Sequence, residues 1–244
     1  MNTTELIKSF EPQKELNPKI WIKEGNSYTM KPEVRNRLLE IANQFIEYLK
    51  IDIIVTDIVL TGSLANYNWS KYSDFDIHII ANFNQFLPSQ IDLYKELFML
   101  KKAIFNKDHD IRIFGYETEL YVESEDEAHF SSGIYSLLYN DWQNKPKKED
   151  IEIDKNTIKR KAKQWMDNID KVLENIEGED IEDAKELISK YKDKLKKFRT
   201  CGLQKGGEYS SENLVFKILR RNGYLEKLSE ASHKILEKGL SMKQ

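Results

Sequence analysis

Two apolar runs joined by a polar segment constrain the fold of this chain more than any other stretch. Residues 58–80 read IVLTGSLANYNWSKYSDFDIHII, with a turn at Gly62 and Ser63 after the first run. The second run opens with Asp74 and Asp76, which flank a phenylalanine. Side chains two apart on a strand share a face, so both carboxylates are expected on one side. The pattern predicts a strand-turn-strand unit with one buried face and one acidic face.

The residue types on that unit indicate a class of chemistry. Two carboxylates on one face repel each other, and a cation between them is the simplest way to keep both ionised. A Gly-Ser turn directly after a strand exposes backbone N–H groups and a hydroxyl, which are the groups that bind phosphate. A phosphate cradle beside metal-binding carboxylates indicates phosphoryl or nucleotidyl transfer.

Apolar periodicity around this unit predicts a small α/β domain. Helix, strand, strand, helix and strand are expected over residues 31–50, 51–61, 74–80, 90–106 and 110–123. The second helix carries Leu93, Leu97, Leu100 and Ile104 on one side, and the last strand is expected to bend at Gly115. Residues 131–142 predict a short helix that packs on the domain.

The second half of the chain is predicted to be all-helical. Long charged helices are expected within residues 156–198, and a mobile glycine-containing loop is expected over 200–209. A short helix that begins at Ser210 or Ser211 and a final helix over 225–238 are expected after the loop. A polar break at 144–150 sets the boundary between two domains, 1–145 and 146–244. The predicted fold class is α+β, with a small mixed-sheet core followed by an all-helical C-terminal part.

Composition narrows the partners and the compartment. The 244 residues carry a net charge of −3 and the sequence pI is about 5.9, so nucleic acid would have to bind through local patches. A single cysteine, Cys201, excludes an internal disulfide framework. The N-terminus lacks an apolar signal core, and no apolar run approaches the roughly 18 residues of a membrane span. These features predict a cytoplasmic protein without a membrane partner.

The spacing of the turn and the carboxylates resembles the signature of the DNA polymerase β-like nucleotidyltransferase superfamily. In this chain Gly62-Ser63 is followed, after ten residues, by Asp74-x-Asp76. The superfamily pattern continues with a third carboxylate on a later strand, and the resemblance covers roughly residues 35–125. It implies a polymerase β-like palm as the core fold.

Two glutamates compete for the third carboxylate. Glu117 and Glu119 share a face of the predicted strand, so alternation alone does not separate them. Glu119 is favoured because Leu120, Tyr121 and the valine after them continue the strand beyond it. Glu123 is predicted to be a solvated strand end.

The resemblance implies a two-cation mechanism with Mg²⁺, or Mn²⁺ in its place. Asp74 and Asp76 would hold both ions, and Glu119 would complete the site of the ion that activates the acceptor hydroxyl. Gly62 and Ser63 would hold the β- and γ-phosphates of a nucleoside triphosphate. The acceptor oxygen would then attack the α-phosphorus in line, and pyrophosphate would leave.

Four basic residues are candidates for contacts with phosphate. Lys71 lies between the turn and the carboxylates, where it either adds charge to the phosphate site or is a solvated surface lysine. Lys217, Arg220 and Arg221 lie at i, i+3 and i+4 of a short amphipathic helix. They either contact a triphosphate or acceptor RNA, or their positive charges stabilise the C-terminal end of the helix through its dipole. His78 is predicted to support or flank the acidic face rather than to bind a metal.

Over the full length, the chain is similar to stand-alone predicted nucleotidyltransferases of large bacterial viruses. The similarity lies in residues 16–21 (LNPKIW), the helix from Pro32, and residues 207–217. A virus-encoded member would act in the host cytoplasm. The acceptors that fit are, in order, an RNA end (tRNA especially), a protein hydroxyl as in AMPylation, and a small molecule such as an aminoglycoside. The alternatives of another class are a catalytically silent nucleotide-binding module and a structural helical protein.

Overall fold

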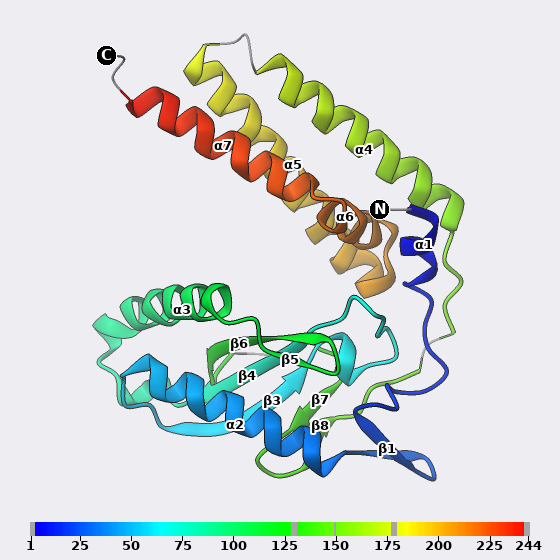
Figure 1. Cartoon of the computed structure of the whole chain (residues 1–244), viewed down its shortest axis with the longest axis vertical. Helices are drawn as coiled ribbons and strands as arrows, with labels where there is room; N and C mark the ends of the chain where they lie inside the picture. Colours follow the sequence, from blue (N-terminus) through cyan, green and yellow to red (C-terminus); the bar gives the residue numbers. More distant parts are fainter. Residues whose placement is uncertain (1–2, 128–130, 149, 177–179, 242–244) are drawn as a thin grey trace. The chain divides into compact units, whose positions relative to one another are not determined.

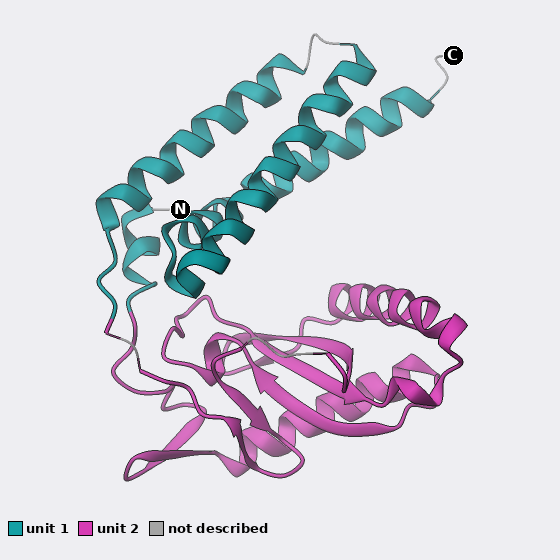
Figure 2. Ribbon diagram, turned by 180° about the vertical axis from the view of Figure 1, so that it is seen from behind, with its two compact units in different colours: residues 1–11, 151–244 teal, residues 12–150 magenta. Residues whose placement is uncertain are grey.

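The structure is a computed structural model that describes residues 3–127, 131–148, 150–176 and 180–241. It divides the chain into two compact units, which Figure 2 colours separately. One unit is Pro12–Asp150 and contains the sheets; the other joins Met1–Glu11 to Ile151–Gln244 and is helical. We describe each unit by itself.

A six-stranded mixed sheet forms the centre of the sheet unit (Figure 1). Its strand order is β5-β6-β4-β3-β7-β8, with β4 and β6 parallel and the other pairs antiparallel. The strands are β3 (Val55–Thr61), β4 (Phe75–Ala81), β5 (Arg112–Ile113), β6 (Tyr116–Ser124), β7 (Ile134–Ser136) and β8 (Asp141–Asn144). A separate hairpin pairs β1 (Trp21–Glu24) with β2 (Ser27–Met30). The predicted mixed sheet is therefore confirmed.

Two long helices cover the apolar face of the sheet. They are α2 (Pro32–Leu49) and α3 (Ile91–Asp108), close to their predicted bounds. Pro32 suits the first turn of α2 because proline lacks the N–H that a helix start leaves unpaired. Phe45 and Phe105 of these helices meet edge to face at 4.9 Å in a core that also contains Phe75 of β4. The opposite face carries Asp76 and His78 together with a smaller buried apolar cluster of Val59, Ile80 and Ile134.

The predicted apolar stripe of α3 is not its buried side. Phe98 and Phe105 point into the core, whereas Leu93, Leu100 and Ile104 are exposed. The heptad-like spacing of the leucines resembles a core pattern, but the larger phenylalanines occupy the core. The stripe is real, and it faces away from the sheet.

Of two further predictions for the sheet unit, the helix over 131–142 was wrong and the strand over 110–123 was confirmed in part. Residues 131–142 form β7 and the start of β8 rather than a helix, because the Trp142 ring stacks on Trp21 at 4.6 Å and its Nε1 donates to Tyr28 O at 2.6 Å. The expected strand over 110–123 is a hairpin of β5 and β6, which Phe114 and Gly115 reverse with positive φ angles of 52° and 87°.

In the helical unit, the short helix α6 (Ser211–Arg221) contacts each of the others: α1 (Thr3–Lys8), α4 (Lys155–Asn175), α5 (Ile181–Gly206) and α7 (Tyr224–Leu240). The loop predicted over 200–209 is instead the last turns of α5 and a 3₁₀ turn. The reason is packing: a Cβ on Gly202 would lie 2.4 Å from Cβ of Glu212, so this glycine lets α5 and α6 approach closely.

The first residues of the chain belong to the helical unit. Leu6, Ile7 and Phe10 are buried there, and Arg221 Nη1 donates to Ser9 Oγ at 3.0 Å. The predicted division at 145/146 placed these residues in the first domain, whereas the compact units place them in the helical one. The second difference is the boundary itself, which lies after Asp150, five residues beyond the predicted position.

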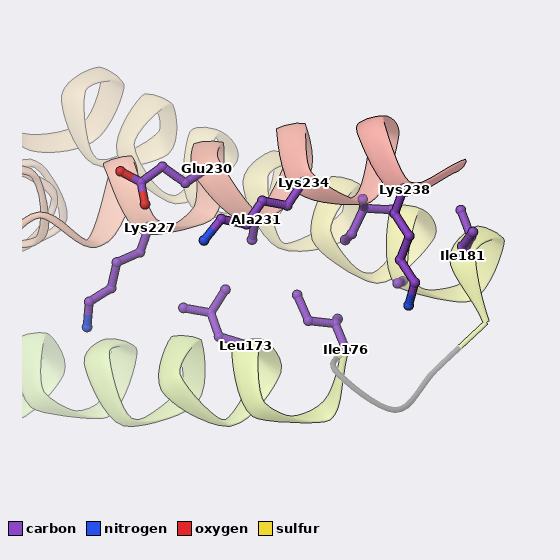
Figure 3. Close-up of a pocket in the computed structure, with 10 residues that line it drawn as sticks. Leu173, Ile176, Ile181, Lys227, Glu230, Ala231, Lys234 and Lys238 are labelled. Atoms are coloured by element: carbon purple, nitrogen blue, oxygen red, sulfur yellow. The ribbon is translucent and has the colours of Figure 1, made fainter. Parts of the chain in front are cut away.

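A groove of about 340 Å³ lies between α4, α5 and α7. In Figure 3, Leu173 of α4 and Ile176, which directly follows that helix, point across the groove toward α7, where Lys227, Lys234 and Lys238 form part of its rim. None of the described helices is long and apolar enough to span a membrane.

Candidate active site

The Gly-Ser turn approaches the second carboxylate closely. Gly62 follows β3 with a φ of +73°, and a Cβ at this position would lie 1.9 Å from Oδ2 of Asp76. Both the conformation and the contact require glycine. Ser63 starts the next turn, and its Oγ donates to Ser73 Oγ at 2.7 Å. This hydrogen bond links the turn to the segment that leads into Asp74.

Strand pairing brings a second carboxylate beside the first. In the parallel ladder of β4 and β6, Asp76 pairs with Glu119, and on its other side Asp76 pairs with Thr61 of β3. Asp74 directly precedes β4. Asp74, Asp76 and Glu119 are half-buried, while the side chains that alternate with them are in the core. Three acids thus lie at one end of the polar face.

The two competing glutamates have different partners. Glu117 is exposed and forms an ion pair with Arg112, its neighbour in the β5–β6 hairpin. Glu119 lies next to Asp76 and accepts a hydrogen bond from Tyr121 Oη at 2.5 Å. Glu123, which was predicted to be solvated, is half-buried and pairs with Nδ1 of His78 at 2.8 Å. The register places Glu119, and not Glu117, with the aspartates.

Two residues that the sequence analysis did not single out complete this face. Tyr121 follows Glu119 by two residues on β6, and the Lys102 ammonium of α3 lies 3.4 Å from the centroid of its ring. Tyr121 was detectable, because alternation puts it on the face of Glu119. Lys102 had no such signal, since only the packing of α3 against β6 brings it here.

The shifted pKa values show how these groups act on one another. Burial, the hydrogen bond to Glu119 and the negative charges of Glu119, Asp76 and Asp74 raise the pKa of Tyr121. Burial lowers the pKa of Lys102, and the charges of Glu119, Asp76 and Glu123 oppose that shift. Glu119 and Asp76 act on both residues, so the groups of this face are electrostatically coupled.

Lys71 and the basic trio have other surroundings. Lys71 is exposed, and its ammonium lies 5.1 Å from the centroid of the Tyr72 ring. Lys217, Arg220 and Arg221 lie on α6 in the helical unit, not in the sheet unit that holds the carboxylates. Arg221 stacks over Phe10 of the N-terminal segment at 4.9 Å in addition to its bond to Ser9.

Arg199 lies close to Lys217, Arg220 and Arg221. The sequence did not indicate that it belongs with them. Its guanidinium lies 4.5 Å from the centroid of the Phe216 ring, and burial and the charge of Arg220 lower its pKa. Burial also lowers the pKa of Lys217, and all three arginines add to that effect. We call Arg199, Lys217, Arg220 and Arg221 the α6 basic cluster.

The carboxylates suit a divalent cation that substrate phosphates also bind. Among the described residues, no three His, Cys, Asp or Glu side chains stand close enough together to hold a metal ion by themselves. Mg²⁺ is commonly bound by one or two carboxylates together with substrate phosphates and water. Asp76 beside Glu119, with the glycine turn against Asp76, provides carboxylates of that kind next to a turn whose backbone N–H groups can bind phosphate.

Comparison with known proteins gives one family and one structural neighbour. A family model described as "Nucleotidyltransferase domain" matches residues 38–200, more than half of the chain. No curated protein matches. A solved structure, the STING-associated CdnE c-di-GMP synthase from Capnocytophaga granulosa, is 15% identical and covers 98% of this chain and 100% of its own, with a TM-score of 0.23. A TM-score that low carries no argument about the fold or the substrate of this chain.

Proposed function

The chain belongs to the nucleotidyltransferase domain family, and from this premise we propose that it moves an NMP from an NTP to the hydroxyl at an RNA end, tRNA in particular. The family lies within the polymerase β-like superfamily that the sequence resembles, and it makes the protein a nucleotidyltransferase. The acceptor and the residue roles are our proposal.

One observation carries the placement of the chemistry: Gly62 and Glu119 flank Asp76. The turn leaves no room for a Cβ against the Asp76 carboxylate, and strand pairing puts Glu119 at its other side. Backbone N–H groups after Gly62 would hold the β- and γ-phosphates, and the Ser63 hydroxyl would join them by turning away from Ser73 Oγ, to which it donates in the structure. The α-phosphate would then lie over the carboxylates.

Asp74 and Asp76 would hold two divalent cations, magnesium or manganese, and Glu119 would share the one on the acceptor side. When bound, these ions neutralise triphosphate charge and make the acceptor hydroxyl more acidic. The chain itself orients the reactants, because Phe75 and Ile77 anchor β4 in the core while Asp76 between them faces the substrate. Catalysis of this kind depends on positioning and charge neutralisation.

The proposed reaction balances without a further reactant. The acceptor oxygen forms a bond to the α-phosphorus, the bond from that phosphorus to the bridging oxygen breaks, and pyrophosphate leaves. The hydroxyl proton is released. No covalent enzyme intermediate is required.

The α6 basic cluster supports an RNA acceptor. Lys217 is half-buried among three arginines, and Glu208 is the acid whose charge opposes their effect on its pKa. RNA phosphates carry the opposite charge to this cluster, and Arg199 and Arg220 can bind them through planar guanidinium groups.

Acceptor identity can be tested by label transfer. The protein is incubated with Mg²⁺ and each α-³²P NTP, and offered total RNA, then cell protein, then aminoglycosides. The proposal expects label on RNA that is lost in Asp76→Asn. Label on protein or on an aminoglycoside would overturn the RNA proposal and leave nucleotidyl transfer standing.

RNA binding gives a separate test of the α6 basic cluster. Arg220→Gln should weaken RNA binding and reduce the slope of log K against log salt by about one. Lys234→Gln, an exposed lysine on α7, is the matched control and should leave the slope unchanged. Equal slopes in the wild type and Arg220→Gln would remove the cluster from the proposed acceptor site.

A further inference from the structure

Tyr121 is placed to control the orientation of the Glu119 carboxylate. It lies one step further along the same face of β6, and its Oη donates to Glu119 Oε2 at 2.5 Å. A charge-assisted hydrogen bond of that length fixes the direction of the acceptor. One oxygen of Glu119 is thus engaged, and Oε1 is left for another ligand.

The tyrosine ring is itself held from two elements. His78 of β4 pairs with Tyr121 in the ladder, and the two rings stack with centroids 4.6 Å apart and planes 8° apart. Nδ1 of the imidazole lies 2.8 Å from Oε1 of Glu123. From α3, the Lys102 ammonium lies 3.4 Å from the ring centroid, within the range of a cation–π contact. The hydroxyl that meets Glu119 therefore sits on a ring with little freedom to turn.

A packing role does not require this arrangement. The core lies on the other side of β6, where Tyr116 and Leu120 are buried. Tyr121 is half-buried on the polar face, and its contacts are a histidine, a lysine and a carboxylate. Mutation of a group that orients a metal-binding side chain through a hydrogen bond typically costs about 10- to 100-fold in metal affinity or activity.

We propose that Tyr121 is a positioning residue that holds Glu119 ready for the divalent cation, with His78 and Lys102 holding the tyrosine ring. The inference rests on the proposed function, because it assigns Glu119 to that cation. It adds a residue whose hydroxyl touches neither the nucleotide nor the cation, and it predicts a change in metal affinity rather than in the chemical step.

The test is Mn²⁺ binding measured by electron paramagnetic resonance, in which free Mn²⁺ gives the signal. An NTP analogue that cannot be cleaved between its α- and β-phosphates is present throughout, so that phosphates complete the site without turnover, and the analogue without protein is the blank. Tyr121→Phe is expected to bind Mn²⁺ 10- to 100-fold more weakly, about the range for lost support of a metal ligand. Its transfer rate should fall at low Mn²⁺ and recover as Mn²⁺ is raised. Recovery of that kind would not follow from a merely structural defect.

Tyr116→Phe is the matched control. Tyr116 lies on the same strand but faces the core, where its hydroxyl accepts a hydrogen bond from Asn17 Nδ2 at 2.9 Å. This variant should lose thermal stability and keep wild-type Mn²⁺ affinity. If Tyr121→Phe does not fold, 4-methylphenylalanine at position 121 keeps the size of the side chain and removes the hydroxyl, and the same weakening is expected.

The outcomes separate the two proposals. Wild-type affinity for Mn²⁺ in the hydroxyl-free variants, with Asp76→Asn strongly weakened, overturns the positioning role and leaves the proposed function intact. Unchanged affinity in Asp76→Asn, or no Mn²⁺ binding by the wild type, overturns the cation site on which both proposals rest.

Discussion

Single residues decide how closely the phosphate turn and the carboxylates approach each other. At Gly62 the constraint is twofold, because φ is positive and the space that a Cβ would need is filled by the Asp76 carboxylate. At Glu119 the constraint is the register of β4 and β6, because this register places Glu119 directly beside Asp76. Both can be tested with substitutions that differ by a few atoms.

Gly62→Ala should reduce nucleotidyl transfer by about 100-fold, because the new methyl group displaces Asp76 or the turn by an ångström or more. The measurement is the initial rate of label transfer from an α-labelled NTP. Gly25→Ala is the control, since φ is +61° there and nothing lies within 4 Å of its Cβ. Equal activity in the two variants would contradict the account of the turn.

Glu119→Gln should abolish transfer at 1 mM Mg²⁺, about the usual working concentration, whereas Glu117→Gln should retain it. Both glutamates lie on β6, and Glu117 is engaged by Arg112 in the hairpin instead of lying beside Asp76. Rates of the two variants are compared over a range of Mg²⁺ concentrations. An inactive Glu117→Gln beside an active Glu119→Gln would reverse the assignment of the third carboxylate.

At the scale of elements, helix α3 has two apolar sides with different roles. Phe98 is 2% exposed and packs in the core, whereas Leu100 is 60% exposed. The exposed stripe adds little to folding of the isolated chain in this arrangement, because its apolar surface stays in water. The buried side holds the helix on the sheet.

Phe98→Ala should lower the free energy of unfolding by about 3–5 kcal/mol, and Leu100→Ala should change it by about 0.5 kcal/mol or less. Urea unfolding of the two variants measures the difference. A loss in Leu100→Ala as large as that in Phe98→Ala would mean that the stripe is covered in solution.

The contact between α4 and α6 includes an ion pair with a pH-dependent contribution. Lys161 Nζ lies 2.7 Å from Oε1 of Glu212 and also donates to Ser211 Oγ at 2.9 Å. The hydrogen bond from Lys161 is the main reason that the pKa of Glu212 lies below its ordinary value of 4.5. A carboxyl with a lowered folded pKa stabilises the fold above its unfolded pKa, and this contribution is lost as the pH falls through the folded value.

Glu212→Gln should therefore destabilise the protein at pH 7 by about 1 kcal/mol or less, with a smaller difference from wild type at pH 3. Urea titrations at the two pH values measure it. Glu186→Gln, which breaks an exposed i,i+4 pair with Lys190, is the control and should show a smaller pH-dependent change. A difference for Glu212→Gln that is the same at both pH values would contradict the linkage.

At the scale of the whole molecule, the family, the α+β class and the mixed sheet followed by helices were predictable from the sequence. The local periodicity of apolar residues predicts α2, β3 and β4, and the spacing from Gly62 to Asp76 indicated the superfamily. Register was only half predictable. Alternation put Glu117 and Glu119 on one face, and pairing with β4 was needed to place Glu119 beside Asp76.

Contacts between distant parts of the chain explain what could not be predicted. The apolar residues of 134–142 fit a helical period as well as a strand period, and stacking of Trp142 on Trp21 decides between them. Gly202 lies in a stretch whose glycines are typical of a loop, but its contact with Glu212 makes it a helix–helix packing site. Phe10 lies under Arg221, and Lys102 lies over Tyr121, and no local pattern encodes either contact.

We propose that NMP transfer takes place at the face formed by Gly62, Asp76 and Glu119. Label transfer from α-³²P and γ-³²P NTP to the acceptor, measured with the wild type and with Asp76→Asn, tests this placement. We expect that the α label is transferred, that the γ label leaves in pyrophosphate, and that Asp76→Asn transfers neither. Transfer of the γ label, or α-label transfer that persists in Asp76→Asn, would rule this placement out.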